Sequence, residues 1–449
     1  MADPSVPSVP PAPRAPVAQD EVARICAELI RFDTTNRGFG DAEGERAAAE
    51  YVAGLLDEVG IEPELFESAP GRASVVARIP GADPARPALV VHGHLDVVPA
   101  RADDWTVPPF AGEVIDGVVW GRGAVDMKDM DAMVLAVVRQ MAREGRRPAR
   151  DVVLAMFADE EAGGPLGSGW AAEHRPDLFE GATEAISEVG GYSVEVGGRR
   201  AYLLQTAEKG LVWLRLVAEG RAGHGSQVNE DNAVTLLAEA VARIGRHRWP
   251  MTLTPTVRRL LEGVADLVGR PFDPDDEAGV EELVAALGPA ARFVGATLRH
   301  TANPTRLDAG YLSNVIPGSA EATVDGRFLP GREAEFDATI RELAGPHVRV
   351  EDRWRDIGPA APLDTPFLDA MADALLAEDP GAAVLPYMLS AGTDNKALAK
   401  IGIAGYGFVP LRLPQGYDFP AMFHGADERV PIESLLFGCR VLDRLLTDC

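Results

Sequence analysis

Cysteine is scarce in this sequence, which has only Cys26, Cys439 and Cys449 among 449 residues. An odd number of cysteines without metal-type spacing predicts neither a disulfide framework nor a cysteine-ligated metal, and it favours a reducing compartment. Long hydrophobic runs are missing as well, since no apolar stretch reaches the about 18 residues that a membrane helix needs. The N-terminus lacks the basic start and apolar core of a secretory signal. We therefore expect a cytoplasmic protein with no membrane partner.

Basic residues are also few, with 43 Lys and Arg against 69 Asp and Glu, which gives a net charge of -26. Such an excess of negative charge argues against nucleic acid or an anionic membrane as a partner, because both are themselves negative. Its simplest interpretation is an acidic surface that keeps the protein in solution. Metal binding would use only a few of these carboxylates.

The length and the hydrophobic content of 46% predict two domains, because one core rarely organises so long a chain. Residues 1–18 are rich in proline and are expected to form a disordered arm. The alternation of predicted strands and helices changes near residue 209, and a proline-rich passage at 358–363 marks the return to the first domain. We therefore predict a first domain in two parts, 19–208 and 358–449, interrupted by an inserted domain at 209–357.

The first domain alternates predicted strands with predicted helices, which indicates an α/β fold with a mostly parallel sheet and flanking helices. The inserted domain combines a helix at 232–244 with a strand at 320–328 whose alternating pattern is typical of an antiparallel, half-exposed sheet, so it is predicted to be α+β. Residues 250–300 predict only local helices, at 256–264 and 277–287. The strands predicted in the first domain are 73–79, 88–91, 151–157, 184–188 and 405–409, and its helices include 44–59 and 129–144.

A histidine and an aspartate, His94 and Asp96, follow the apolar run 87–91. Side chains two residues apart on a strand share a face, so the aspartate can orient an imidazole that holds a metal. Taken alone, the pair fits a purely structural contact equally well.

Five more residues of the same chemical kinds stand at predicted strand ends and in loops, where a parallel sheet gathers its functional groups. Two imidazoles with several carboxylates suit a pair of divalent metals, most naturally zinc, with one carboxylate left free to take a proton from water. Each residue by itself also fits a helix cap or loop start. The five are Asp126, Glu160, Glu161, Glu188 and His424.

Together with their surroundings these segments resemble the signature blocks of the dinuclear zinc aminoacylase and carboxypeptidase family. This family includes aminoacylase-1, carboxypeptidase S, acetylornithine deacetylase, succinyl-diaminopimelate desuccinylase and the bacterial glutamate carboxypeptidases. The blocks match in order from about Glu21 to the C-terminus. The resemblance implies a zinc-exopeptidase-like catalytic domain carrying an inserted lid that also serves dimerisation.

The resemblance further implies roles for individual residues. His94, Asp126 and Glu188 would bind one metal, while Asp126, Glu161 and His424 would bind the other. Asp96 would orient His94, and Glu160 would be the general base. The Asp126-Met127 peptide bond would be cis.

In the inserted domain, the segment 222–226 resembles the family's lid motif, which implies that His224 holds the carbonyl oxygen of the reacting amide, often in the partner subunit. By the same resemblance, Asn314 and Arg327 would contact the substrate's carboxylate, as would the loop of Gly392 and Thr393. Lys396 departs from the arginine of many relatives. The long 250–300 stretch is expected to make the lid longer than in compact relatives.

The leading hypothesis is a metal-dependent amidohydrolase that cleaves N-acyl amino acids or small peptides with a free carboxylate, using two divalent ions, with zinc first and cobalt or manganese as alternatives. A dipeptidase on the same scaffold is the second hypothesis. The third is a catalytically inactive binding protein.

Overall fold

The structure is a computed structural model that describes residues 16–38 and 40–449. Most of the predicted N-terminal arm lies outside these residues. Ala18, its last residue, instead begins helix α1 (Ala18–Ile30) and is buried. The ordered domain therefore starts at least one residue earlier than the sequence pattern predicts.

The main domain is built on a nine-stranded sheet with parallel strands at its centre, which confirms the predicted α/β class. β3 runs parallel to both β6 and β7, and β7 runs parallel to β17. Antiparallel pairs occur towards the edges, including β1 with β2 and β8 with β9. The strand order is β1 (Pro63–Ala69), β2 (Arg72–Ile79), β6 (Val152–Phe157), β3 (Ala88–His94), β7 (Ala182–Ser187), β17 (Ala404–Gly407), β9 (Arg199–Glu208) and β16 (Ala383–Leu389), with β8 (Tyr192–Val196) beside β9.

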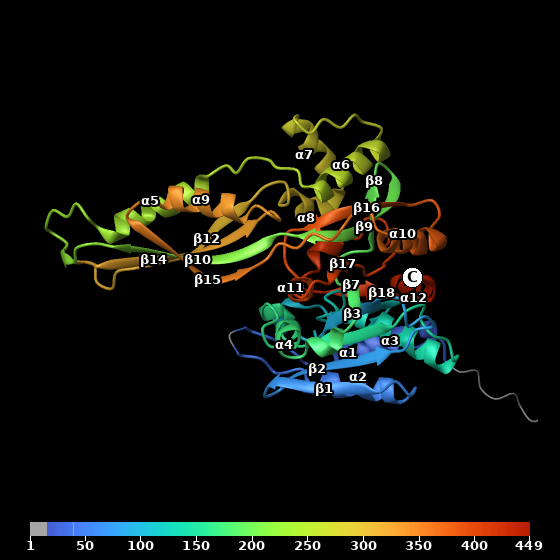
Figure 1. The fold of residues 1–449 in the computed structure, drawn as a ribbon. Helices are drawn as coiled ribbons and strands as arrows, with labels where there is room; N and C mark the ends of the chain where they lie inside the picture. Colours follow the sequence, from blue (N-terminus) through green and yellow to red (C-terminus); the bar gives the residue numbers. More distant parts are fainter. Residues whose placement is uncertain (1–15, 39) are drawn as a thin grey trace, which may run out of the picture.

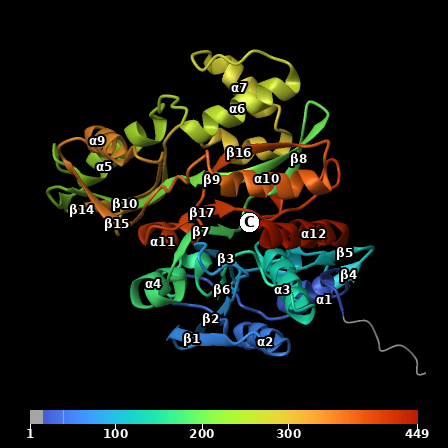
Figure 2. The ribbon, with the colours of Figure 1, turned by 45° about the vertical axis from the view of Figure 1, so that its right-hand side comes forward.

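Helices cover both faces of this sheet, as Figure 2 shows. Alternate residues of the central strands supply the two cores, because successive side chains of a strand point to opposite faces. Val91 and Leu154 belong to the larger core, whereas Val90 and Val153 belong to the smaller one. The larger core involves α1, α2 (Arg46–Asp57), α3 (Lys128–Arg143), α10 (Pro366–Glu378) and α12 (Ile432–Asp448), and the other side carries α4 (Ser168–His174) and α11 (Asn395–Lys400).

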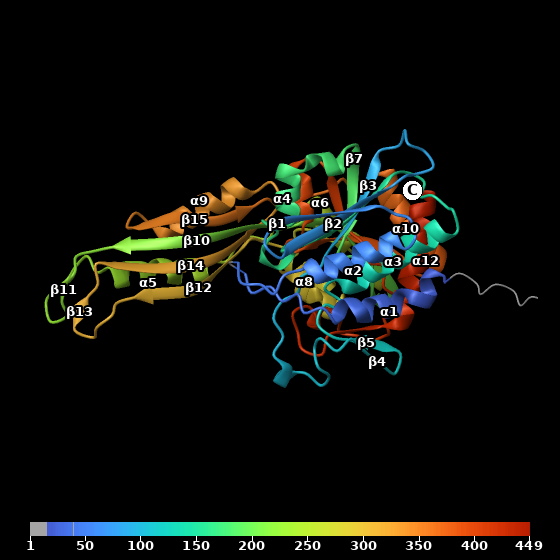
Figure 3. The ribbon, with the colours of Figure 1, turned by 90° about the horizontal axis from the view of Figure 1, so that it is seen from below.

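The lid is a separate four-stranded antiparallel sheet that projects from the main domain (Figure 1). Two helices pack against it and enclose a core of its own. A two-residue ribbon, β11 with β13, lies at the end of the lid away from the main domain (Figure 3). The elements are β10 (Gly210–Glu219), β11 (Gly223–His224), α5 (Ala233–Arg246), β12 (Thr301–Ala309), β13 (Val315–Ile316), β14 (Ser319–Phe328), α9 (Glu333–Ala344) and β15 (Val348–Asp356).

The helices of the 250–300 segment pack on the main domain, which differs from the expectation that they extend the lid. α6 (Pro255–Val268) lies against β16, β8 and β9 of the nine-stranded sheet. Its buried residues Val257, Leu260 and Val264 join the larger main core. The amphipathic face of α6 gave no sign of which sheet would bury it. The segment continues through α7 (Glu277–Ala285), a 3-10 turn η4 (Gly288–Ala290) and α8 (Ala291–Gly295).

The remaining elements are short. A three-stranded sheet joins β4 (Glu113–Ile115), β5 (Val118–Trp120) and β18 (Arg429–Pro431). The 3-10 turns are η1 (Ala102–Asp104), η2 (Glu160–Ala162), η3 (Pro176–Phe179) and η5 (Phe419–Ala421). In the part of the chain that the structure describes, no helix is both long and apolar enough to span a bilayer.

Candidate metal centre

His94 is the last residue of β3, and its imidazole is buried among carboxylates. Its Nδ1 lies 3.0 Å from the backbone oxygen of Asp96, and its Nε2 lies 3.2 Å from Asp126 Oδ1. Burial lowers the pKa of His94, but Asp126, Asp96 and Glu188 together raise it well above its ordinary value. Gly93 is required beside it, because a Cβ there would come within 2.0 Å of a carboxylate oxygen of α3.

Asp126 lies between the two imidazoles. Its Oδ1 faces His94, while its Oδ2 lies 3.3 Å from Nε2 of His424. Burial opposes its charge, yet His424 and His94 hold the pKa of Asp126 below its ordinary value. The Asp126-Met127 peptide bond is cis, as expected. The loop is held from behind by the buried Glu428, whose carboxylate accepts hydrogen bonds from the backbone N–H groups of Gly123, Val125 and Asp126.

His424, from the C-terminal part of the chain, belongs to the same site. Its Nε2 lies 3.2 Å from Glu161 Oε2, and its backbone adopts the left-handed region at φ 58°. Its side chain is 58% exposed, unlike the other groups of the cluster. The hydrogen bond to Asp126, and then that to Glu161, raise the pKa of His424 to about 10.

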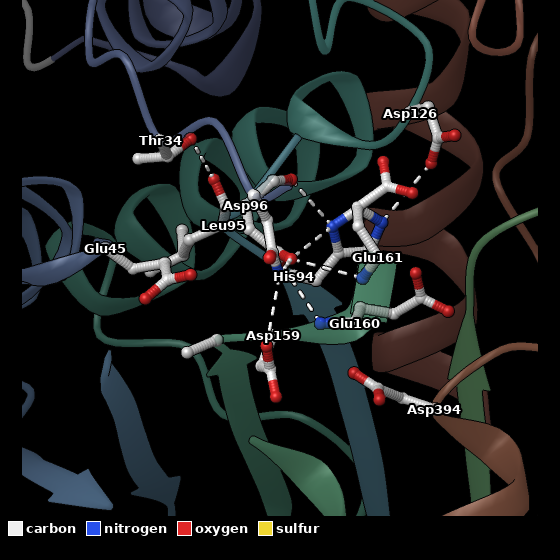
Figure 4. A network of polar contacts seen from close by, with 12 residues as sticks. Thr34, Glu45, His94, Leu95, Asp96, Asp126, Asp159, Glu160, Glu161 and Asp394 are labelled. Atoms are coloured by element: carbon white, nitrogen blue, oxygen red, sulfur yellow. Dashed lines mark hydrogen bonds and ion pairs between the residues drawn. The ribbon is translucent and has the colours of Figure 1, made fainter. Parts of the chain in front are cut away.

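Glu160 and Glu188 complete the cluster, as Figure 4 shows for Glu160. Glu188 Oε2 lies 3.7 Å from His94 Nε2, and ligand atoms of His94, Glu160 and Glu188 fall within 4.8 Å of one another. Burial, followed by repulsion from Glu188, raises the pKa of Glu160 well above its ordinary value. Burial also raises the pKa of Glu188 to about 8.

The donor set fits divalent cations. Glu161 Oε1 and Glu188 Oε1 are buried and have no hydrogen-bond partner among the described residues. Buried carboxylate oxygens without donors are costly unless a cation neutralises them. His94, Asp126 and Glu161 also bring one ligand atom each within 4.8 Å of one another. Imidazole and carboxylate ligands in such a cluster suit zinc and related metals.

A polar network that sequence reasoning missed supports the two neighbouring glutamates. Asp96 Oδ1 and Oδ2 each lie 3.1 Å from the backbone nitrogens of Glu160 and Glu161, respectively, and accept their N–H bonds (Figure 4). Asn36 Nδ2 then donates to Asp96 Oδ2 at 2.8 Å and to Asp159 Oδ1 at 3.0 Å. No motif marks Asn36, which follows the first helix in a Thr-Thr-Asn sequence.

The network continues to a buried arginine. Arg72 Nη2 lies 2.9 Å from Asp159 Oδ1 and 2.6 Å from Glu45 Oε1. Asp159 has a positive φ of 70°, and its side chain accepts a hydrogen bond from the Leu166 N–H. Two adjacent carboxylates, Asp96 and Asp159, are therefore held together by donors from α1's loop and from β2.

A cavity of about 550 Å³ opens in front of the cluster, between the main domain and the lid. Asp126, Glu160, Glu161, Glu188 and His424 line its main-domain side. The lid contributes aromatic, aliphatic and charged side chains. Those from the lid strands are Leu211, Trp213, Arg327, Trp354, Arg355 and Asp356.

Arg327 lines this cavity, as the resemblance requires of a substrate contact. Its Nε donates to Asp325 Oδ1 at 2.8 Å, and its Nη2 donates to Asp325 Oδ2 at 3.1 Å. The pair fixes the guanidinium while leaving Nη1 without a hydrogen bond to any residue that the structure describes. An exposed edge of this kind can pair with a carboxylate.

Thr393 and Gly392 also line the cavity, but Thr393 is already engaged. Its hydroxyl donates to Glu208 Oε1 at 2.5 Å, and its N–H donates to Glu208 Oε2 at 3.1 Å. Lys396 crosses directly behind Gly392, where a Cβ would come within 2.3 Å of the lysine Cε. Both donors of Thr393 are therefore used by Glu208 at the end of β9, unlike the substrate contact that the sequence predicts.

His224 and Asn314 lie elsewhere, at the far end of the lid (Figure 3). His224 is exposed, and its Nδ1 lies 2.8 Å from Ser226 Oγ. The Asn314 backbone oxygen accepts the N–H of Gly225, and His224 pairs with Val315, so His224 and Asn314 lie close together. Neither belongs to the lining of the cavity among the described residues. The structure thus brings together His94, Asp126, Glu160, Glu161, Glu188, His424 and Arg327, but not His224 or Asn314.

Comparisons with known proteins agree with this arrangement. The model of peptidase family M20/M25/M40 matches residues 90–448. Aminoacylase-1 of Homo sapiens is 26% identical over 414 residues, which cover 89% of each chain. A probable carboxypeptidase S-like protein of Dictyostelium discoideum is 27% identical over 392 residues, covering 80% of this chain and 71% of that protein.

Solved structures share the fold. A metallo-carboxypeptidase of the M20 family from Sulfolobus solfataricus superposes with a TM-score of 0.70 at 17% identity, covering 95% of this chain and 98% of its own. A dinuclear metal-binding peptidase of Bacillus subtilis gives a TM-score of 0.59 at 15% identity, covering 96% and 97%. The family match spans most of the sequence, including every residue of the cluster. The chain therefore belongs to peptidase family M20/M25/M40 and is a metallohydrolase of the aminoacylase and carboxypeptidase type.

Proposed function

We propose that this protein hydrolyses the amide bond of an N-acyl amino acid or a small peptide that carries a free carboxylate. The observation that carries the proposal is the position of Glu160. Its half-buried carboxyl group shares a cavity with the ligand cluster and with the basic side chain of Arg327. A proton acceptor, a candidate metal centre and a carboxylate anchor in one cavity are what this reaction needs.

The proposed metal partition is the one that the family resemblance implies, and pairwise distances in the cluster support it. His94, Asp126 and Glu188 would hold one divalent ion, and Asp126, Glu161 and His424 would hold the other. Zinc is the first choice, with cobalt and manganese as alternatives. Such ions polarise an amide carbonyl and lower the pKa of a water molecule.

Glu160 acts as the general base in the proposed reaction. It accepts a proton from the attacking water as a C–O bond forms at the carbonyl carbon. It returns this proton to the leaving nitrogen as the C–N bond breaks, so the products are a carboxylic acid and an amine. Asp96 acts as a positioning residue. Its carboxylate fixes the backbone of Glu160 and Glu161, and its backbone oxygen contacts His94.

The free carboxylate of the substrate would pair with the open edge of Arg327 and with the backbone at Gly392. The planar guanidinium offers paired donors to a carboxylate. The similarity to aminoacylase-1 and to a carboxypeptidase S-like protein supports substrates of this class. Three free and buried cysteines are compatible with the cytoplasm, which we propose as the compartment.

We further propose that the protein acts as a homodimer through its lid. In one chain His224 and Asn314 lie at the end of the lid, whereas the reacting carbonyl belongs at the candidate metal centre. The lid of a second copy would bring these two residues to the site. Exposed apolar side chains at Leu307, Tyr311 and Leu312 support a contact at this end.

The test compares wild type with Glu160→Gln after reconstitution with zinc, cobalt or manganese. The substitution removes the base but keeps the shape of the side chain, so we expect kcat to fall by about 10³-fold while metal content stays the same. Glu173→Gln, at an exposed position of α4, is the matched control and should retain wild-type rates. The readout is amine release from a panel of N-acyl amino acids and dipeptides.

Each other outcome has a definite meaning. Retained activity in Glu160→Gln would refute the assignment of the base. A higher kcat/KM for dipeptides than for N-acyl amino acids would favour the dipeptidase alternative. No hydrolysis of any compound by the metal-loaded wild type would indicate a binding protein instead.

A further inference from the structure

The cavity in front of the candidate metal centre has two separate aromatic walls. Trp213 and Trp354 form one wall on the lid, with their ring centroids 5.3 Å apart. Phe293 and Phe423 form the other wall, with centroids 5.7 Å apart and ring planes at 81°. Phe423 directly precedes His424, so the second wall adjoins the candidate metal centre. An apolar wall at such a place favours an apolar group of the substrate.

Phe293 comes from α8, at the end of the helical segment that packs on the main domain. The segment is attached to the His424 loop, because Arg292 Nη2 lies 3.1 Å from Asp418 Oδ2. On its other side, Lys209 Nζ donates to the backbone oxygens of Ala296 and Arg299, both at 2.9 Å. Phe293 is therefore held in place from two directions.

Its ring partner is equally well supported. Phe423 packs on Phe419 with centroids 5.1 Å apart, and Phe419 in turn packs on the buried Tyr192 at 4.8 Å. Phe293 and Phe423 are themselves only half-buried, and both line the cavity. The stacked aromatic side chains thus end at Phe293 and Phe423, whose rings a substrate in the cavity can cover.

The two walls differ in their polar neighbours, which assigns them to different ends of a substrate. Trp213 Nε1 donates to Asp325 Oδ2 at 3.2 Å, and Asp325 also holds Arg327. The tryptophan wall therefore accompanies the proposed carboxylate anchor and faces the amino-acid part. The phenylalanine wall adjoins His424 instead, so we assign it to the acyl part.

We propose that Phe293 and Phe423 form an acyl subsite that favours apolar acyl chains longer than acetyl. The inference rests on the proposed function and adds the acyl preference to it. It also gives the 255–295 segment a role, since its last helix supplies one of the two rings. Both residues act by contact with the substrate and take no part in bond breaking.

The test measures kcat/KM for N-acetyl, N-butanoyl and N-hexanoyl derivatives of one amino acid. For wild type we expect the value to rise with chain length, because each added CH₂ is buried against the rings. In Phe293→Ala the hexanoyl-to-acetyl ratio should fall by about tenfold, as expected for the loss of a large apolar contact. Phe272→Ala removes the same ring from the same segment outside the cavity lining, and it should leave the ratio unchanged.

A second series with N-acetyl derivatives of alanine and phenylalanine separates the two walls. If Phe293→Ala changes this series and not the acyl series, the assignment of the wall is wrong. An unchanged acyl ratio would overturn the subsite altogether. Phe293→Trp, which narrows the subsite, should depress the hexanoyl-to-acetyl ratio even if the alanine variant folds poorly. Absence of hydrolysis in the wild type would instead refute the proposed function.

Discussion

At the scale of single residues, the main finding concerns Asp96. The sequence predicts a carboxylate that orients His94, but the Asp96 Oδ1 lies 3.5 Å from His94 Nδ1 while the closer contact uses its backbone oxygen. Its carboxylate instead receives the backbone N–H groups of Glu160 and Glu161. Asp96 thus links the end of β3 to the turn after β6. Asn36 supports it with a donor that no local pattern marked.

Replacement of Asn36 by alanine should expose the importance of this network. The change leaves the buried Asp96 and Asp159 carboxylates with one donor fewer, so we expect the free energy of unfolding to fall by about 1–3 kcal/mol. Because the backbone of Glu160 would be less fixed, kcat should fall more than KM rises. Urea denaturation and steady-state kinetics measure the two effects.

The matched control is Asn229→Ala, because the Asn229 side chain makes only exposed hydrogen bonds among the described residues of the lid, to the Arg221 backbone oxygen and from the Asp231 N–H. It should change neither quantity appreciably. Unaltered stability and kcat in Asn36→Ala would show that the network does not position the glutamates.

At the scale of elements, α11 connects the cavity to the lid. Lys396 on this helix has a buried side chain, and its Nζ donates at 2.7 Å to the backbone oxygens of both Lys209 and Ile357. Lys209 lies between β9 and β10, where the chain enters the lid, and Ile357 directly follows β15, where the chain leaves it. The lysine is further paired with Glu208 at 3.5 Å, the carboxylate that holds Thr393. The Lys396 ammonium group therefore fastens the two lid connections.

Lys396→Met should loosen these connections. Two buried carbonyl oxygens would lose their donor, so amide hydrogen exchange in the free enzyme should accelerate by about tenfold or more at residues 209–211 and 357–359. Lys400→Met is the control on the same helix, because Lys400 is exposed and its one ion pair within the described part of the chain is with Asp356, at 2.8 Å. It should leave exchange at 209–211 unchanged. A raised KM with unchanged exchange in Lys396→Met would instead indicate a direct contact with the substrate.

At the scale of the whole molecule, the lid separates residues that the proposed reaction needs together. His224 lies at the end of the lid, whereas Glu160 lies in the main domain beside the cavity. A symmetric dimer would resolve this separation, because each lid could serve the site of the other chain. The packing of α6 on β16 leaves the lid sheet and its ribbon free of the long insertion.

Mixing two inactive variants tests this arrangement. His224→Ala and Glu160→Gln should each be inactive alone, but random exchange of subunits gives heterodimers with one intact site. Activity should recover to about a quarter of the wild-type value, since half of the dimers would carry one good site of two. Size-exclusion chromatography with light scattering checks the dimer. No recovery after exchange, with a dimer present, would place His224 outside the partner's site.

The sequence by itself determined the mixed sheet, the separate lid and the residues of the cluster. Short apolar runs such as 88–91 and 152–157 indicate buried strands, and the polar residues after such strands gather at the carboxyl ends of parallel neighbours. His94, Asp126, Glu161 and His424 were therefore predictable as one cluster from their positions and their motif resemblance.

Only the tertiary structure decided which groups support that cluster and which aromatic side chains line the cavity in front of it. Asn36, Arg72 and Glu428 contact the site through long-range hydrogen bonds, and sequence spacing carries no information on such contacts. The 250–300 segment shows the same limit, because an amphipathic helix records that one face is buried but not against which sheet. Packing on the main domain, and not on the lid, is what brings Phe293 to the cavity.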